Sequence, residues 1–474
     1  MFQERRRFLH GTVAAAMTAA GNSLLPDIFL EKETPRSGRS PNIIFILMDD
    51  LGWHELGCYG NTFNETPHLD RLAGQGVRFL RAYAAAPVCS PTRAALLTGQ
   101  WPARLGITDY LRPDSQTLLS PQHPTLAQML KKAGYRTGII GKWHLCGYAG
   151  QGGREAYPDT HGFDETLISE IRGIGGGSYF HPYHFNPGIP RRLEEKEFLV
   201  DRMNRESVEF IERHRAQPFF LFLSHYAVHT ALLGKPELVA KYESKPESGK
   251  GPKSARNNPH LAAQLESVDQ GVGMIVDKLR ELSLAENTLI IFTSDNGGEG
   301  NVTSNEPLRG AKSMLYEGGI RESMIVWWPG VVPAAATCAA PVSTVDFYPT
   351  LIEMAGIAPK SSHPPDGVSL LPFFRDPKHS PQPSRPLYWH YPLDKPHFLG
   401  GDSAGAMLGP DDFKIIEHYD DGRMELYNLK EDPGEKKDLA RALPQKAASM
   451  KRQFHHWLDS LGTVAPQLPK GKNP

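Results

Sequence analysis

Short apolar runs alternate with amphipathic stretches along most of the chain. Four runs are rich in β-branched and aromatic residues, which favour strands, and they cover residues 42–48, 137–140, 219–223 and 288–293. Because successive positions in these runs are apolar, we expect strands that are buried on both faces, as in a parallel sheet covered by helices. The pattern predicts an α/β fold with a large, mostly parallel central sheet flanked by helices.

Two helices stand out in the remaining pattern. Residues 261–282 place apolar side chains at helical spacing, which predicts a long helix packed on the core. A shorter helix is expected around residues 94–97, because Pro91 suits a first helical turn and Gly99 suits a C-cap. Cys89 would then lie at the N-terminus of this helix, where free backbone N–H groups favour an anionic partner. The alternative is a small buried apolar cysteine or half of a disulfide.

The C-terminal part of the chain has a different pattern. Proline-rich segments at residues 359–365 and 377–386 predict a boundary. Beyond it, β-rich runs at residues 413–419 and 424–427 flank the turn sequence Asp420-Asp421-Gly422, which is typical of a β-hairpin. We expect three parts in order: an export signal and linker at residues 1–35, a catalytic domain at residues 41–380, and a small C-terminal α+β subdomain with an antiparallel sheet at residues 386–465.

The N-terminus has the features of a targeting segment. Arg5-Arg6-Arg7 precedes a weakly apolar, alanine-rich stretch with small residues near Ala20, where a signal peptidase could cut. This pattern resembles a twin-arginine export signal, which implies a twin-arginine translocase and a periplasmic or extracellular location. The alternative is a basic arm beside an incidental alanine-rich stretch. The rest of the chain contains no apolar run long enough to span a bilayer.

Composition narrows the range of partners. The chain has 474 residues, with 52 Lys and Arg against 53 Asp and Glu, so its formal net charge of -1 gives no overall field that favours nucleic acid. Its four cysteines are too few for a disulfide framework in a chain of this length. If Cys89 is reactive, at most one disulfide can form among the remaining three.

Polar side chains follow each predicted strand. They are Asp49 and Asp50, Lys142 and His144, His225 and His229, and Asp295 and Asn296. In open α/β sheets, ligands bind beyond the carboxyl ends of the strands, so we expect these side chains to converge on one edge. Lys142 and His144 would point to the same side if their segment is extended.

The acidic members of this set predict a metal site. Asp49, Asp50, Asp295 and Asn296 offer only oxygen ligands, which suit Ca²⁺, or Mg²⁺ in a tighter geometry. Taken one pair at a time, the alternative is ordinary turn or helix-cap chemistry. A metal, a Lys-x-His pair and a helix N-terminus that carries Cys89 together suit the binding of a tetrahedral oxyanion.

Two long motifs carry a resemblance to a known family. Residues 87–99 read PVCSPTRAALLTG and contain Cys-x-Pro-x-Arg, and residues 134–144 read GYRTGIIGKWH. Further matches lie at residues 66–72, 309–312, 317–319, 426–429 and 432–433. From about Pro41 to the C-terminal region, the chain resembles a type I sulfatase of the alkaline-phosphatase superfamily. Thr92 departs mildly from the motif, where serine is commoner, but it keeps the hydroxyl.

The resemblance implies a modified nucleophile and a calcium ion. Cys89 would be oxidised to formylglycine by a maturation enzyme, and one hydroxyl of the hydrated aldehyde would attack the sulfate ester. Residue 89 would complete a Ca²⁺ site with the side chains named above as metal ligands, and Mg²⁺ is the less expected ion. Arg93 would hold the second hydroxyl and the metal-binding carboxylates.

Roles for the basic residues also follow from the resemblance. Lys142, Lys312 and His229 would bind sulfate oxygens, and His229 or Lys312 would protonate the leaving alcohol. His144 would take the proton from the second hydroxyl and so expel sulfate. His225 would have a supporting or structural role.

The implied function is hydrolysis of a sulfate ester, by an arylsulfatase-like sulfuric ester hydrolase. The substrate would be a sulfated small molecule or glycan, with a sulfated sugar or polysaccharide expected from the family and the compartment. Two alternatives stay open: a phosphodiesterase or phosphonate monoester hydrolase on the same fold, and a non-catalytic sulfated-glycan-binding protein. Trp389, His390, Tyr391 and His397 are candidates for contacts with other substrate groups, with structural packing as the alternative.

Overall fold

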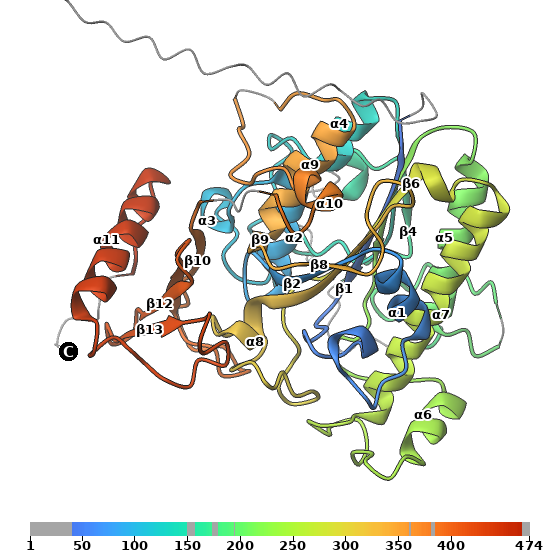
Figure 1. The fold of residues 1–474 in the computed structure, drawn as a ribbon. Coiled ribbons are helices and arrows are strands. Elements are labelled where there is room, and N and C mark those ends of the chain that lie inside the picture. Colours follow the sequence, from blue (N-terminus) through green and yellow to red (C-terminus); the bar gives the residue numbers. More distant parts are fainter. Residues whose placement is uncertain are drawn as a thin grey trace, which may run out of the picture. The chain divides into compact units, whose positions relative to one another are not determined.

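The four predicted strands lie next to one another in a nine-stranded sheet of the computed structural model (Figure 1). The structure describes residues 40–148, 157–172, 179–193, 195–359, 362–380 and 384–466. The strand order is β4-β3-β5-β1-β6-β7-β2-β8, and β9 pairs with β2. The strands are β1 (Asn42–Met48), β2 (Val77–Tyr83), β3 (Arg136–Gly141), β4 (Glu165–Leu167), β5 (Phe219–Ser224), β6 (Thr288–Ser294), β7 (Arg321–Trp327), β8 (Ala336–Cys338) and β9 (Val342–Ser343).

The direction of the strands confirms the predicted α/β class. Strand β1 runs parallel to both of its neighbours, β5 and β6. Strand β7 runs antiparallel to β6 and β2, which makes the sheet mixed. The two pairs that β3 forms, with β4 and β5, are parallel as well. The carboxyl ends of β3, β5, β1 and β6 therefore meet at one edge of the sheet.

Helices cover both faces of this sheet, which explains why its strands are apolar at consecutive positions. Phe45 and Leu47 of β1 pack in one buried cluster with α2, α4, α9 and α10. Ile44 and Ile46 point to the opposite face and pack with α1, α5 and α7. The helices are α1 (Pro67–Gly74), α2 (Cys89–Thr98), α4 (Leu126–Lys132), α5 (Leu199–His214), α7 (Pro259–Glu281), α9 (Phe347–Met354) and α10 (Leu371–Arg375). Shorter helices are α3 (Pro102–Leu105), α6 (Pro236–Glu243) and α8 (Glu317–Ile320).

Both helices predicted from the sequence are present. The long helix α7 begins after Asn258, whose side chain accepts hydrogen bonds from the backbone N–H groups of His260 and Leu261. Helix α2 begins at Cys89 and ends before Gly99, which has a φ of 69°, a left-handed conformation that glycine adopts without strain. All ten residues of α2 are buried.

A four-stranded antiparallel sheet follows in the C-terminal part, as predicted. Its strands are β10 (Leu387–Tyr391), β11 (Ala404–Leu408), β12 (Phe413–His418) and β13 (Met424–Asn428), and α11 (Pro444–Ser460) follows them. Strands β12 and β13 form the predicted hairpin. The predicted boundary between the two parts includes residues 381–383, which lie outside the described residues, and it stays a prediction.

Two polar contacts join this second sheet to the main part of the chain. The indole N–H of Trp389 donates to the backbone carbonyl of Ala84 at 2.7 Å. Lys414 Nζ lies 3.0 Å from Glu317 Oε1 and 2.9 Å from Glu435 Oε1, and all three side chains are fully buried. Because a buried ion without its partner is costly, Lys414 holds the hairpin to α8.

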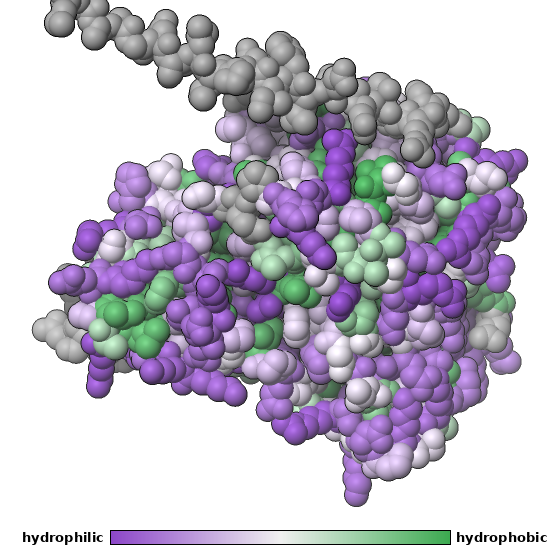
Figure 2. All heavy atoms as spheres, viewed as in Figure 1, coloured by the Kyte–Doolittle hydropathy of each residue, from purple (hydrophilic) through white to green (hydrophobic). Residues whose placement is uncertain are grey.

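The remaining sequence predictions concern cysteine pairing, membrane spans and the export segment. All four cysteines are free thiols. Among the described residues, no helix has both the length and the apolar character needed to cross a membrane. The face seen in Figure 2 is mostly hydrophilic, with hydrophobic side chains in small groups. The predicted export segment lies outside the described residues.

The buried ion triad generates a prediction about stability. Replacing Lys414 by alanine leaves the carboxylates of Glu317 and Glu435 buried without a cation, and we expect the free energy of unfolding to fall by about 3–5 kcal/mol. Chemical denaturation measures this change. Lys451→Ala is the control, because this lysine is itself 41% exposed and its partner Glu417 also pairs with His455, so the substitution should change stability much less. Equal effects of the two substitutions would contradict the assigned role of Lys414.

Candidate active site

The polar residues that follow the four strands come together at the carboxyl edge of the sheet. Asp49 and Asp50 follow β1, and Asp295 follows β6, its neighbour in the sheet. Lys142 follows β3, and its backbone N–H donates to the carbonyl of Ser224 at the end of β5. The convergence expected from the sequence is therefore present in the structure.

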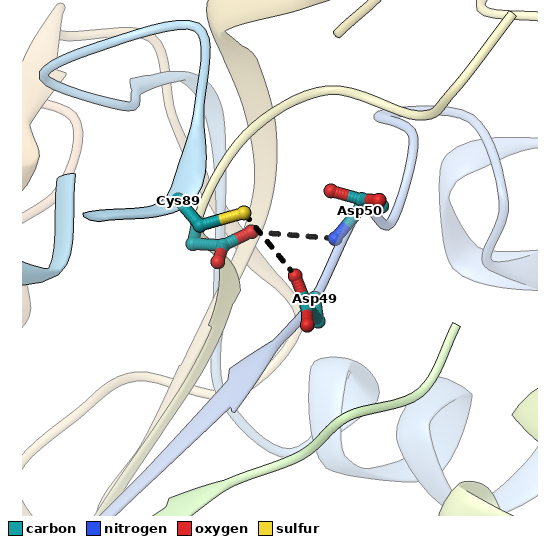
Figure 3. Close-up of side chains that lie close together, drawn as sticks. Asp49, Asp50 and Cys89 are labelled. Carbon is teal, nitrogen blue, oxygen red and sulfur yellow. Dashed lines mark hydrogen bonds between the residues drawn. The ribbon is translucent and has the colours of Figure 1, made fainter. Parts of the chain in front are cut away.

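Three carboxylates and a thiol form the centre of this site. Asp49, Asp50, Asp295 and Cys89 are buried, and one ligand atom from each lies within 4.8 Å of the others. The Cys89 Sγ is 3.7 Å from Asp49 Oδ1, and the backbone N–H of Asp50 donates to Asp295 Oδ1 at 3.3 Å (Figure 3). Asn296 lies beside them: its Nδ2 donates to Asp50 Oδ1 at 2.8 Å.

This donor set fits a hard cation. Carboxylate and amide oxygens are the ligands that Ca²⁺ and Mg²⁺ prefer in proteins. The Oδ1 atom of Asn296 is buried and, across the described ranges, has no hydrogen-bond partner. A buried oxygen of this kind costs free energy unless it finds a partner, and a bound cation would supply one. The residues present therefore suit a divalent metal.

Three cations balance the carboxylates. Arg93 donates from Nε and Nη2 to Asp295 Oδ2 at 2.9 and 2.6 Å. Lys142 Nζ lies 2.7 Å from Asp49 Oδ2, and Lys312 Nζ lies 2.7 Å from Asp50 Oδ2. Burial opposes ionisation of Asp50, but the charge of Lys312 and weaker contributions outweigh it, so the pKa of Asp50 is lowered. The site can thus hold a cluster of charged groups away from water.

Helix α2 fixes residue 89 in front of the carboxylates. The helix begins at Cys89, and Val88 before it is extended. Arg93, one turn along, also donates from Nη1 to the hydroxyl of Ser224 at 2.6 Å, which ties the helix to β5. Burial raises the pKa of the Cys89 thiol to about 12. The thiol is therefore neutral at physiological pH, and an unmodified Cys89 is a poor nucleophile here.

His144 has a defined tautomer. Its Nε2 lies 2.8 Å from the backbone carbonyl of Leu111, and because a carbonyl only accepts, Nε2 must donate. The other nitrogen, Nδ1, is buried and has no hydrogen-bond partner within the part of the chain that the structure describes. Burial, followed by the charge of Lys142, holds the pKa of His144 well below its usual value. Neutral His144 therefore presents a free lone pair on Nδ1.

One expectation about this segment is wrong. Lys142 and His144 do not belong to an extended run, because β3 ends at Gly141 and His144 has a φ of 55°. The left-handed conformation of His144 turns the chain and brings its ring to the loop at Leu111.

Glu170 stabilises this turn, a role that no motif or spacing in the sequence indicates. Its carboxylate accepts hydrogen bonds from the backbone N–H groups of Trp143 and His144, at 3.0 and 2.6 Å. It also accepts from the hydroxyls of Tyr148 and Tyr226, at 2.5 and 2.7 Å. Glu170 lies in the loop after β4, so only the folded chain places it under the Lys-x-His segment.

The two histidines after β5 lie in different surroundings. His229 Nδ1 donates to the Thr230 carbonyl at 2.5 Å, which leaves Nε2 3.7 Å from Asp50 Oδ2. Burial and then the charge of Lys312 lower the pKa of His229 to about 4. His225 is fully buried, and its burial lowers its pKa to about 3. His229 faces the carboxylate cluster, whereas His225 has the environment of a structural residue.

Comparisons with known proteins agree with this geometry. A family model described as Sulfatase matches residues 41–357, and one described as N-sulphoglucosamine sulphohydrolase, C-terminal, matches residues 310–462. N-acetylgalactosamine-6-sulfatase of Canis lupus familiaris is 36% identical over 366 residues, which are 70% of this chain and 65% of that protein. This chain thus spans slightly less than two thirds of that relative. A sulfatase of Formosa agariphila is 30% identical, with 92% of both chains covered.

Solved structures show the same fold. The crystal structure of Ps i-CgsB in complex with k-i-k-neocarrahexaose has a TM-score of 0.78 and 29% sequence identity, and the match covers 91% of this chain and 96% of that chain. A second structure of Ps i-CgsB has a TM-score of 0.76 and 30% identity. The likeness extends over both sheets, because the matches cover most of either chain.

The position of Glu170 generates a prediction. In Glu170→Ala, four hydrogen-bond donors around the Lys-x-His segment lose their acceptor, and we expect the free energy of unfolding to fall by at least ~2 kcal/mol. Glu170→Gln keeps one acceptor oxygen and should lose less. Glu65→Gln is the control, because Glu65 is an exposed partner of Lys241. Equal stability of all three variants in denaturant titrations would contradict this role of Glu170.

Proposed function

The chain belongs to the sulfatase family, and on that premise we propose that it hydrolyses the sulfate ester of a sulfated sugar. One observation carries the proposal: residue 89 of the Cys-x-Pro-x-Arg motif lies within 4.8 Å of three buried carboxylates that follow two neighbouring strands. A nucleophile, a metal and a ring of cations at one point suit a tetrahedral oxyanion such as sulfate.

The nucleophile that we propose is formylglycine at position 89. An oxidising maturation enzyme removes the sulfur and two hydrogens from the cysteine side chain and adds one oxygen, which gives an aldehyde. Hydration of the aldehyde supplies two hydroxyls on one carbon. The Cys-x-Pro-x-Arg motif and the place of residue 89 beside the carboxylates support this proposal, because one hydroxyl of the hydrated aldehyde can attack the sulfate ester and deprotonation of the second expels the product.

Calcium is the metal that we propose for the carboxylate cluster. Asp49, Asp50, Asp295 and Asn296 would hold the ion through oxygen atoms, and residue 89 lies next to them. When bound, such an ion polarises a sulfate oxygen and lowers the pKa of a hydroxyl near it. A smaller ion such as Mg²⁺ requires a stricter octahedral geometry and is the less suitable choice.

The cations around the cluster would bind the substrate and protonate its leaving group. Lys142 and Lys312 stay protonated at physiological pH, since nearby carboxylates outweigh the effect of burial and raise the pKa of both ammonium groups. They can therefore neutralise charge on the sulfate throughout the reaction. His229 has an Nε2 that faces Asp50 and the cluster, but Nδ1 holds the proton of the neutral ring. Nε2 can therefore protonate the leaving alcohol only from the imidazolium form, which the negative charge of a bound sulfate favours. Lys312 is the second candidate for this step.

Release of sulfate requires a base, and His144 has the required form. Attack on the sulfur atom leaves residue 89 as a sulfated gem-diol with one free hydroxyl. When Nδ1 of His144 takes the proton of that hydroxyl, the carbonyl re-forms and sulfate leaves with the electrons of its C–O bond. Arg93 donates to Asp295, one of the carboxylates beside residue 89, and from there it can position the hydroxyl.

Relatives of this chain support the proposed substrate class. One relative is named for a sulfated amino sugar, and Ps i-CgsB was crystallised with a neocarrahexaose. A phosphodiesterase or phosphonate monoester hydrolase on the same fold is one competing function, and non-catalytic glycan binding is another.

We also propose export through a twin-arginine translocase to the periplasm or the exterior, supported by Arg5-Arg6 and the alanine-rich stretch after them.

The modification at position 89 can be tested directly. In active protein, mass spectrometry of the peptide that contains residue 89 should show the loss of mass expected for formylglycine. Cys89→Ala should abolish hydrolysis of 4-nitrophenyl sulfate, whereas the control Cys58→Ala should keep it, since Cys58 lies outside the cluster. Fully active protein with an unmodified cysteine would disprove the modification.

The same protein can be tested for the competing phosphodiesterase or phosphonate monoester hydrolase function. Faster hydrolysis of 4-nitrophenyl phosphate than of 4-nitrophenyl sulfate would favour that function.

Metal binding has a readout that does not depend on activity. Ca²⁺ at about 100 times its Kd should raise the free energy of unfolding by about 2.7 kcal/mol. Asp295→Ala should remove this gain, and Asp277→Asn should retain it because Asp277 is exposed on α7. Differential scanning calorimetry with and without Ca²⁺ measures the effect. Stabilisation by Zn²⁺ and not by Ca²⁺ would show that the ligand set has been misassigned.

A further inference from the structure

We propose that His397, Phe398 and Arg112 form a binding site for the sugar unit that carries the sulfate ester and for a second anionic group on the same glycan. This proposal rests on the sulfatase function above and names the substrate class: a sugar sulfate with a second sulfate or a carboxylate within reach. The three residues come from two loops that lie beside the catalytic residues.

The first loop, residues 109–112, is attached to the catalytic residues on two sides. The backbone N–H of Leu111 donates to the hydroxyl of Ser90, next to Cys89, at 3.0 Å. The carbonyl of Leu111 accepts from His144 Nε2 at 2.8 Å. Tyr110 and Arg112 flank this anchored residue, so both lie at the rim of the candidate active site.

The second loop, residues 397–401, is held against the segment that carries Lys312. His397 and Gly401 close the loop, with the His397 N–H donating to the Gly401 carbonyl at 2.7 Å. Gly401 packs so closely on Ser313 that a Cβ there would lie 1.9 Å from the Ser313 carbonyl oxygen. The rings of Tyr110 and His397 are 5.4 Å apart at 74°, which joins the two loops.

His397 offers a hydrogen-bond donor that the protein does not use. The backbone N–H of Leu399 donates to His397 Nδ1 at 3.1 Å, so Nε2 carries the proton of the neutral ring. That Nε2 atom is buried, and no described residue accepts a hydrogen bond from it. Burial and then the charge of Lys312 lower the pKa of His397 to about 4, so the ring is neutral at physiological pH. A sugar hydroxyl or sulfate oxygen is the acceptor that would satisfy Nε2–H.

The other candidates named from the C-terminal sequence have partners within the protein. Trp389 donates to the Ala84 carbonyl, and His390 Nδ1 lies 2.8 Å from the hydroxyl of Tyr419. Tyr391 OH lies 3.4 Å from Asp109 Oδ1, which supports the first loop. These three residues therefore have structural roles within the protein, whereas His397 retains a free hydrogen-bond donor.

Phe398 and Arg112 extend the site outward. Phe398 is 79% exposed, the highest value among the large hydrophobic residues that the structure describes, and its ring stacks on His397 at 4.5 Å and 28°. An aromatic face held at the rim in this way suits the apolar face of a sugar ring. The guanidinium of Arg112 lies 4.4 Å over the Tyr110 ring, with half of its side chain exposed. Its Nη2 lies 3.4 Å from Asp109 Oδ2, and the other N–H groups of the planar fork suit a carboxylate or a sulfate.

The test compares substrates that differ by one group. The assays compare formylglycine-bearing wild type with three variants, His397→Ala, His397→Gln and Arg112→Gln. The first substrates are 4-nitrophenyl sulfate, monosulfated galactose and monosulfated N-acetylhexosamine. The sugar with the highest kcat/KM is then assayed in two further forms. One form carries a second sulfate group, and the other is linked to a uronate. His379→Ala is the control, because His379 is an exposed histidine outside both loops. Circular dichroism and thermal unfolding verify that each variant is folded.

We expect His397→Ala to lose about tenfold more kcat/KM on the sugar sulfate than on 4-nitrophenyl sulfate, as for one lost hydrogen bond. His397→Gln retains an N–H donor and should recover part of this loss. Arg112→Gln should lose about tenfold more on the doubly charged sugars than on the monosulfated one, and the two doubly charged sugars show whether a sulfate or a carboxylate is preferred.

Three results would overturn the proposal: equal losses on all substrates, no loss on any sugar, or a wild type that hydrolyses 4-nitrophenyl sulfate but none of the sulfated sugars. Absence of all sulfate hydrolysis by formylglycine-bearing protein would instead contradict the proposed function.

Discussion

The site depends on one electrostatic constraint: the repulsion between carboxylates buried at one edge of the sheet must be balanced. Asp49, Asp50 and Asp295 follow neighbouring strands and are buried together, an arrangement that is stable only if positive charge surrounds it. Arg93, Lys142 and Lys312 supply that charge from a helix and two loops that are far apart in sequence. The loops around the sheet are therefore positioned by electrostatics as well as by the apolar core.

The sequence was most informative where structure is local. Continuous apolar runs predicted the central strands, because both faces of the sheet are covered, and the polar residues after them had to meet at one edge. The hairpin and α2 followed from turn and cap residues. Glu170 and the left-handed His144 could not be predicted, since their roles depend on contacts between loops that no spacing in the sequence reveals.

The second sheet contributes to the site as well as to the fold. Trp389 and Lys414 connect it to the main part of the chain. The loop between β10 and β11 carries His397 and Phe398 to the rim, beside the segment of Lys312. The carboxylates proposed to bind the metal follow strands of the large sheet, whereas Phe398 is exposed on this loop and can change without disturbing them. The C-terminal part thus supplies two of the three residues proposed for sugar binding, and Arg112 comes from the part that also carries the residues proposed for chemistry.

Complete burial of α2 has a consequence for the order of events in the cell. Cys89 is 2% exposed and its helix has no residue at the surface, so another enzyme cannot reach this side chain in the folded protein. If residue 89 is oxidised as proposed, the maturation enzyme must act on the nascent or unfolded chain. A chain that folds before this oxidation would then be permanently inactive.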